Sequence, residues 1–336
     1  MLRPSRRILL ALGGLVLASG CFGQTPPGTQ TFALTDTTGL VARNVTLKAV
    51  EYKGRKALLI TKNTPDEGFA LLPSTDFQDG TIEADLAVKI TTPPGVRMPG
   101  FLGIAFRARP DASHYELFYI RPKNSTADDQ GMRNHSVQYS EAPDFGWNKL
   151  RREWPFVYEA YAPLQVETWT KIKIEVKGRS ARLFLNGSEE PSLVVNGLKG
   201  EDLHGAVALW GYQGEEAYFS NVRITNAAPQ PLKNGSDAAG TWHVKYASDN
   251  GVFEGSLKLT RQGQKLSGTW TGAFGNDLAV SGEWRDGYVD LKFPVTWPDD
   301  HSSSTAHLAG WIDGNSAEGR MEVEGRADGP WTATRE

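Results

Sequence analysis

The sequence contains a single cysteine, Cys21, in 336 residues, which excludes an intramolecular disulfide and a cysteine-rich zinc site. It also lacks an excess of positive charge: 36 Lys and Arg stand against 39 Asp and Glu, a formal net charge of −3. Nucleic-acid binding usually requires a basic surface, so this balance argues against a nucleic-acid partner. Beyond the first twenty residues, no stretch reaches the roughly 18 apolar residues of a transmembrane helix. The 10 Trp, 10 Tyr and 14 Phe, in contrast, are ample material for large cores and stacking surfaces.

Residues 1–20 have the pattern of a signal peptide. A basic start, MLRPSRR, precedes the apolar run ILLALGGLVLA, which is too short to span a bilayer as a helix. The following string LASGC, residues 17–21, resembles a bacterial lipobox, in which the cysteine receives a diacylglycerol and becomes the new amino terminus. We therefore expect lipidation of Cys21, a polar tether over residues 21–30, and an exported lipoprotein held on a membrane of the cell envelope, in the periplasm or on the outer membrane. The alternative is ordinary cleavage nearby, with Cys21 incidental.

Most of the remaining chain follows the two-residue alternation of β-strands. In residues 80–89, the apolar side chains of Ile82, Ala84, Leu86 and Val88 share one face. Many short strands over about 190 residues, separated by turns, predict a sandwich of two antiparallel sheets. We assign this sandwich to residues 31–226. Further predicted strands are residues 169–177, 181–185, 205–210 and 217–224.

The pattern changes after residue 226. Residues 227–238 contain two prolines, no aromatic residue and several small polar residues, which is typical of a linker. Residues 239–336 contain six of the ten tryptophans and repeat the phrases LSGTW, VSGEW and LAGWIDG. Successive hairpins over about one hundred residues close most simply into an up-and-down barrel, which leaves no exposed strand edge. Gly240-Thr241-Trp242 is similar to the opening of lipocalin-like barrels. The predicted fold class is therefore all-β: a jelly-roll sandwich followed by a small antiparallel up-and-down barrel.

Three stretches carry more aromatic and charged residues than strand patterning requires: residues 103–122, 133–139 and 147–161. Together with the phrases LVVNGLKG and ALWGYQGEEAYFSNVRI, they resemble secreted bacterial proteins of the concanavalin A-like lectin and glucanase superfamily. The most similar group is that of the 3-keto-disaccharide hydrolase-like, or laminin-G-like, domains. The resemblance covers about residues 30–226. It implies a concanavalin A-like jelly roll and a carbohydrate as ligand or substrate.

The candidate binding residues come from these stretches. Tyr119 and Arg121 point to the same side of a strand, and an aromatic ring beside a guanidinium group can stack on a sugar and bind its hydroxyls. Because a turn at 110–113 makes the two flanking strands a hairpin, we expect Arg107 to line one cleft with these two residues. Alternatively, these arginines pair with acids only to hold the long insert in place. The predicted ligand-binding residues are Arg107, Glu116, Tyr119, Arg121, Asn134, His135, Gln138, Tyr139, Trp147, Arg151, Glu153, Tyr158 and Glu159.

The sequence leaves catalysis open. Laminarinase-type members of the superfamily carry their acids as Glu-x-Asp-x-(x)-Glu, and Glu83-Ala84-Asp85 begins that spacing, but residues 86–88 supply no third acid. The chain also lacks a Gly-x-Ser-x-Gly elbow, a phosphate-binding loop and a His-Glu-x-x-His motif. We therefore assign no catalytic residue, no cofactor and no metal. Calcium is the one ion considered, and its candidate ligands are Asp111, Asn124, Asp128 and Asp129, whose spacing does not demand an ion.

These observations favour a glycan-recognition protein of the bacterial cell envelope, exported and anchored to a membrane by lipid. One alternative is a carbohydrate-active enzyme, a glycoside hydrolase or lyase of the 3-keto-disaccharide hydrolase type. Another is a structural envelope protein that binds other proteins. Glu and Arg paired in one cleft would favour the enzyme, a flat aromatic strip would favour binding, and the lack of any concavity near residues 107–161 would favour the structural role.

Overall fold

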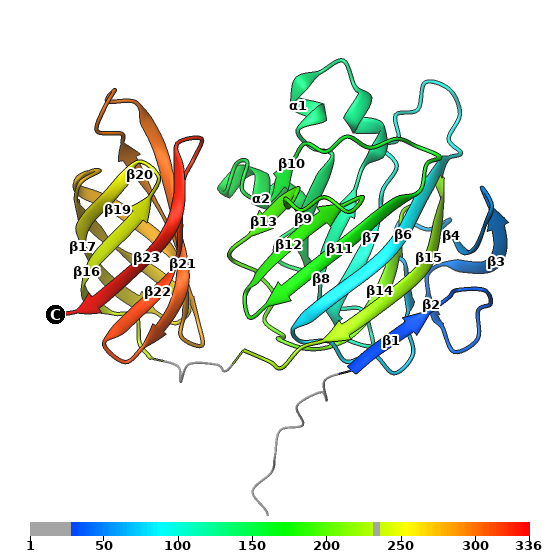
Figure 1. The fold of residues 1–336 in the computed structure, drawn as a ribbon, viewed down its shortest axis with the longest axis horizontal. Coiled ribbons are helices and arrows are strands. Elements are labelled where there is room, and N and C mark those ends of the chain that lie inside the picture. The colour runs from blue at the N-terminus through cyan, green and yellow to red at the C-terminus, as the bar shows by residue number, and fades with distance from the viewer. Residues whose placement is uncertain (1–27, 231–235) are drawn as a thin grey trace, which may run out of the picture.

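The computed structural model describes residues 28–230 and 236–336 (Figure 1). The predicted signal peptide, Cys21 and most of the tether lie outside the described residues, as do residues 231–235 of the predicted linker. None of the helices in the described ranges is long and apolar enough to cross a membrane. The sandwich and the barrel each bury a hydrophobic cluster of their own. The predicted fold class, a jelly-roll sandwich followed by a barrel, is confirmed.

Two antiparallel sheets form the sandwich. The strands of the eight-stranded sheet are β1 (Gly28–Phe32), β3 (Thr46–Tyr52), β4 (Arg55–Thr61), β6 (Gly80–Ile90), β11 (Thr170–Lys177), β12 (Ser180–Leu185), β13 (Leu193–Val195) and β15 (Glu215–Asn226). Those of the seven-stranded sheet are β2 (Val41–Arg43), β5 (Phe69–Leu71), β7 (Leu102–Ala108), β8 (Tyr115–Ile120), β9 (Val137–Ala142), β10 (Glu159–Ala160) and β14 (Ala206–Gly211). The first sheet runs β13-β12-β11-β6-β15-β4-β3, with β1 paired to β15, and the second runs β10-β9-β8-β7-β14-β5-β2.

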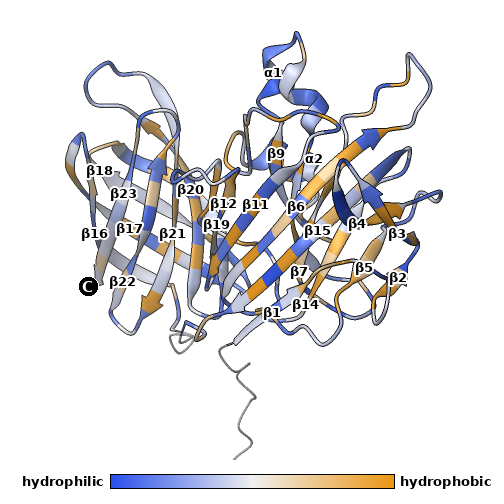
Figure 2. Cartoon of the chain, turned by 45° about the vertical axis from the view of Figure 1, so that its right-hand side comes forward, coloured by the Kyte–Doolittle hydropathy of each residue, from blue (hydrophilic) through white to orange (hydrophobic). Residues whose placement is uncertain are grey.

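The alternation in the sequence decides which side chains enter the core. The apolar residues of β6, from Ile82 to Val88, are fully buried between the sheets, and those of β11 lie beside them through the pairing of Ile172 with Ala84. Polar residues occupy the opposite faces, and Figure 2 shows the change of hydropathy along single strands such as β6 and β15. The predicted strands at 80–89 and 169–177 are confirmed within one residue at each end.

The seven-stranded sheet is apolar on both faces. Its inner face buries Phe106 and Phe118 in the core of the sandwich. Its outer face carries a second cluster, which includes Tyr115, Tyr119 and Trp210. Three short helical segments rise from this sheet between β8 and β10. They are the 3-10 helix η1 (Pro122–Thr126), α1 (Gln130–Arg133) and α2 (Trp147–Glu153).

The carboxyl-terminal domain is a closed barrel in which every strand pairs with the next, and the last pairs with the first. Its strands are β16 (Gly240–Ser248), β17 (Gly251–Gln262), β18 (Lys265–Gly272), β19 (Gly275–Arg285), β20 (Tyr288–Thr296), β21 (Ser303–Asp313), β22 (Ser316–Val323) and β23 (Ala327–Arg335). Large side chains such as Trp242, Trp270 and Phe293 fill its interior. The cavity between Trp242 and Trp331 measures only about 10 Å³, about the room of one water molecule.

The barrel contacts the sandwich at the helical insert. The ammonium group of Lys199 pairs with Asp290 on β20, and the ammonium group of Lys292 donates to the backbone carbonyl of Glu153 at the end of α2. The hydroxyl group of Tyr288 donates to the backbone carbonyl of Asn196, just after β13. Figure 1 shows α2 and β13 on the side of the sandwich that faces the barrel.

Candidate functional site

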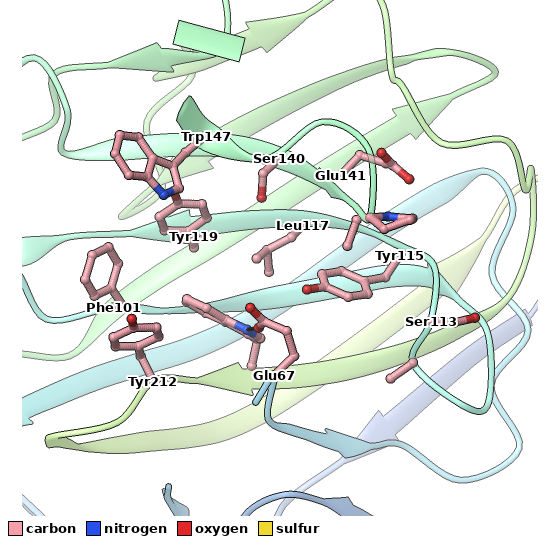
Figure 3. Close-up of a pocket in the computed structure, with 15 residues that line it drawn as sticks. Glu67, Phe101, Ser113, Tyr115, Leu117, Tyr119, Ser140, Glu141, Trp147 and Tyr212 are labelled. Carbon is pink, nitrogen blue, oxygen red and sulfur yellow. Dashed lines mark hydrogen bonds between the residues drawn. The ribbon is translucent and has the colours of Figure 1, made fainter. Parts of the chain in front are cut away.

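A groove crosses the outer face of the seven-stranded sheet (Figure 3). It consists of two adjoining cavities of about 490 Å³ and about 520 Å³. Both cavities share Phe101, Tyr119, Trp147 and Tyr212 in their lining. These volumes lie within the range of small-molecule binding sites, so the groove has room for several sugar units or a comparable ligand.

Aromatic rings form the floor and one wall of the groove. The ring centroids of Tyr119 and Trp210 are 5.4 Å apart, and those of Phe101 and Tyr212 are 4.9 Å apart, so the floor is a continuous aromatic surface. Tyr119 and Trp210 are almost fully buried, whereas Trp147 on α2 is 51% exposed. The Trp147 ring is therefore the one most available to stack against a ligand.

One end of the groove is acidic. Glu67 and Glu141 both line this end, on either side of Tyr115. Glu67 accepts a hydrogen bond from the indole Nε1 of Trp210 at 2.7 Å. Oε2 of Glu141 accepts the backbone N–H of Phe145 at 3.1 Å. Burial, together with a second carboxylate nearby, raises the pKa of Glu141 to about 7. A carboxyl group that titrates near neutral pH can both take up and release a proton there.

The other end of the groove is basic and is built around Glu159, which lies just beneath the lining. Arg151 donates to this carboxylate twice, from Nε to Oε1 at 2.9 Å and from Nη2 to Oε2 at 2.7 Å. Nη2 of Arg121 lies 3.7 Å and Nδ1 of His135 lies 2.8 Å from the same Oε2. Burial lowers the pKa of His135.

The family model described as 3-keto-alpha-glucoside-1,2-lyase-like domain matches residues 37–225, more than half of the chain and nearly the whole sandwich. The chain belongs to this family. This finding confirms the resemblance drawn from the sequence, and we refer to residues 37–225 as the lyase-like domain. A comparison with curated proteins found no significant match.

Several solved structures are similar to the chain. The carbohydrate binding module CBM66 from Bacillus subtilis is 19% identical, with a TM-score of 0.38, and the match covers 56% of this chain and 96% of that chain. The Bacillus licheniformis beta-glucanase is 12% identical, with a TM-score of 0.37, and the match covers 60% of this chain and 99% of that chain. The lectin from Bauhinia forficata in complex with GalNAc is 11% identical, with a TM-score of 0.35, and the match covers 61% of this chain and 100% of that chain.

The lyase-like domain brings five of the sequence-predicted residues together in the lining of the groove. These are Tyr119, Arg121, His135, Trp147 and Arg151. Trp147 and Arg151 are one turn apart on α2, with the guanidinium carbon 4.9 Å from the ring centroid, because residues four apart share a helix face. Two more predicted residues support the lining from behind. They are Glu159 and Gln138, which accepts a hydrogen bond from Arg121.

Arg107 does not line the groove, contrary to our expectation. The pairing of β7 with β14 contains a β-bulge, in which Phe106 and Arg107 of β7 lie opposite the single residue Val207 of β14. Arg107 adopts the left-handed backbone conformation there, with φ of 50°. Its side chain turns into the interior, where Nη2 donates to Asp79 at 3.1 Å and to the carbonyl of Gly178 at 2.7 Å. The predicted hairpin of β7 and β8 exists, but the carboxyl ends of two antiparallel strands lie at opposite ends of the hairpin. Arg107 near the end of β7 and Arg121 after the end of β8 are therefore far apart.

The other predicted residues also lie away from the groove. Glu116 and Tyr139 bond to each other on the inner face of the sheet, and Oε1 of Glu116 accepts the N–H of Gly200 at 3.1 Å. The hydroxyl group of Tyr158 donates to the carbonyl of Gly197 at 3.0 Å, so these three side chains hold the loop after β13. The remaining two make local surface contacts: Asn134 with Gln130, and Glu153 with Arg152.

Sequence reasoning missed several groove residues, notably Glu67, Phe101, Trp210 and Tyr212. Trp210 and Tyr212 are two apart, and the alternation of β14 could have placed both on the outer face. Glu67 and Phe101 precede the strands β5 and β7, where no periodic pattern exists to show which side chains meet.

Two of the candidate calcium ligands accept local backbone hydrogen bonds. Asp111 accepts the backbone N–H of Ser113 at 3.0 Å, and Asp129 caps α1 by accepting the N–H of Met132 at 2.7 Å. Across residues 28–230 and 236–336, no group of three His, Cys, Asp or Glu side chains is arranged to hold a metal ion.

Proposed function

We propose that the lyase-like domain binds a carbohydrate in the groove of the seven-stranded sheet. The observation that carries this proposal is the half-exposed ring of Trp147 above an aromatic floor, with charged groups at both ends of the same groove. An aromatic ring stacks on the apolar face of a sugar, while charged and amide groups bind its hydroxyls. The concavity beside residues 107–161 counts against the purely structural alternative.

A specific observation favours a second candidate, an enzyme of the kind named in the family description. Elimination from a 3-keto-α-glucoside removes the proton on C2, forms a double bond between C1 and C2, and breaks the bond from C1 to the glycosidic oxygen, which takes up a proton. The step needs a base with a pKa near the working pH. Glu141 has a pKa of about 7 and lines the groove, so its carboxylate is our candidate for that base.

One experiment tests both candidates on the purified protein. Calorimetric titration with neutral and acidic oligosaccharides measures binding, and incubation with a 3-keto-α-glucoside, followed by release of the aglycone, measures turnover. Binding without turnover supports recognition alone. Turnover that Glu141→Gln abolishes, while binding persists, supports the enzyme. The absence of both from the folded protein would overturn the proposal.

We further propose that the protein is exported and anchored through a lipid on Cys21, as the lipobox-like string indicates. Stable anchoring requires more than one acyl chain, which lipoprotein maturation supplies. Cys21→Ser should move the protein from the membrane fraction to the soluble fraction. Identical fractionation of parent and variant, with an unmodified amino terminus by mass spectrometry, would contradict this proposal.

A further inference from the structure

Three arginine side chains converge at the basic end of the groove: Arg97, Arg121 and Arg151. Burial, together with the positive charges of Arg151 and Arg97, lowers the pKa of Arg121. Like charges held this close are unfavourable unless an opposite charge compensates them. The carboxylate of Glu159 compensates in part, and it is already shared with His135.

The acids at this end do not balance the three guanidinium groups. Besides Glu159, the lining contributes one carboxylate, Asp129, which is engaged in capping α1. The three guanidinium groups therefore face only two carboxylates, those of Glu159 and Asp129. The positive excess lies at the wall of an open cavity of about 520 Å³, where a ligand can reach it.

Hydrogen-bonding capacity is also unused at this end. The side chain of Arg121 is 7% exposed, and its Nε has no hydrogen-bond partner within the described part of the chain. The same holds for the amide Nε2 of Gln138, which is 1% exposed. Buried donors are almost always satisfied in folded proteins, so the unpartnered Nε of Arg121, which lines the cavity, indicates an acceptor that enters with a ligand.

We propose that the basic end of the groove is a subsite for an acidic substituent on the bound sugar, the carboxylate of a uronic acid or a sulfate ester. This inference rests on the proposed function, because it names the class of carbohydrate that the groove takes. A guanidinium group binds both anions through paired, charge-assisted hydrogen bonds. Tyr119 and Trp147 lie next to the arginines and would hold the sugar ring that carries the charge.

Matched pairs of ligands test the inference. The first pair is tetragalacturonate and its fully methyl-esterified form, which have the same sugars but differ in charge. The second pair is a sulfated galactan tetrasaccharide and its desulfated form. We expect at least one acidic member to bind about tenfold or more tightly than its neutral partner, since one charge-assisted contact corresponds to about that factor. The pair that shows this difference identifies the source of the anion.

Two arginine variants separate the subsite from a general charge effect. Arg97 is exposed in the lining, so Arg97→Gln should fold and should remove most of the preference for the acidic member. Arg152→Gln is the matched control, because Arg152 lies on α2, is 66% exposed and pairs with Glu153 away from the groove. It should leave both affinities unchanged.

The outcomes are distinguishable. Equal affinity for the acidic and neutral members of both pairs overturns the subsite but leaves carbohydrate binding intact. An equal effect of Arg97→Gln and Arg152→Gln on the acidic ligand also overturns it, because the preference would then come from net charge alone. Failure of every member to bind would overturn the proposed function and the subsite together.

Discussion

Lys199 of the sandwich and Asp290 of the barrel form an ion pair in which the lysine side chain is only 1% exposed. The ammonium group also lies 3.9 Å from the ring centroid of Trp154, directly after α2. Because α2 carries Trp147 and Arg151 into the groove, the barrel supports the helix that forms one wall of the candidate site. This contact gives the carboxyl-terminal barrel a structural role beside the groove.

Loss of Asp290 should therefore destabilise the protein. Asp290→Ala leaves the buried Lys199 ammonium without its counter-ion, and removing one partner of a buried pair costs about 3–5 kcal/mol. The free energy of unfolding, measured with urea, should fall by this order. Asp249→Ala, in the exposed turn after β16, is the control and should leave the curve unchanged. Equal curves for the two variants would contradict the role of this pair.

Trp147 should contribute to binding rather than to stability. Its ring is 51% exposed, so Trp147→Ala removes little buried surface and should barely change the melting temperature. The free energy of carbohydrate binding should weaken by about 1–3 kcal/mol, which is the range for loss of one aromatic side chain that stacks on a nucleic-acid base. Phe156→Ala serves as the control, because Phe156 is 71% exposed and is not part of the lining. A large drop in melting temperature with unchanged affinity would show that Trp147 is a structural clamp.

Glu141 should make stability and activity depend on pH in opposite directions. Its pKa rises from about 4.5 to about 7 on folding, so between these values the folded state keeps a proton that the unfolded state has lost. The stability that the protonated Glu141 contributes to the free energy of unfolding is fully present below pH 4.5, and it is lost as the pH rises through about 7. Glu141→Gln should therefore stabilise the protein at pH 8, by on the order of 1–3 kcal/mol, and change little at pH 4.

The same titration predicts the pH profile of any elimination reaction. A general base must be deprotonated, so kcat/KM should rise with pH through about 7 and become flat above it. A profile that is flat from pH 5 to pH 9 would contradict the role of Glu141 as the base. Equal stability of the parent and Glu141→Gln at pH 8 would contradict its raised pKa.

Arg107 should be essential to the sandwich and not to the groove. Its side chain is 1% exposed and joins Asp79 to two backbone carbonyls, so Arg107→Met leaves Asp79 buried without its ion-pair partner. We expect a loss of about 3–5 kcal/mol of stability. Arg109→Met breaks a solvent-exposed pair with Asp202 and should change stability little. Carbohydrate affinity of the folded fraction should be the same in both variants, and a selective loss in Arg107→Met would contradict this assignment.

The strands and the direction of their side chains could be predicted from the order of the residues alone. Alternation is a local property, so it placed β6 and β11 correctly and put Tyr119 and Arg121 on the same side of the chain. The repeated hairpins of the carboxyl-terminal domain likewise predicted the closed barrel, because neighbours in the sequence are neighbours in an up-and-down barrel. The motif phrases were sufficient to recognise the family.

Which residues share the groove depends on how the strands pack and pair in three dimensions. A single bulge in β7 turned Arg107 into the core, and a one-residue slip of that kind has no signature in the alternation. Glu67 precedes β5 and Glu141 lies near the end of β9, and they line one groove only because β5, β14, β7, β8 and β9 are neighbours in one sheet. The pKa of Glu141 has the same origin, since burial and nearby charge depend on what the fold packs around a group and not on its own residue type.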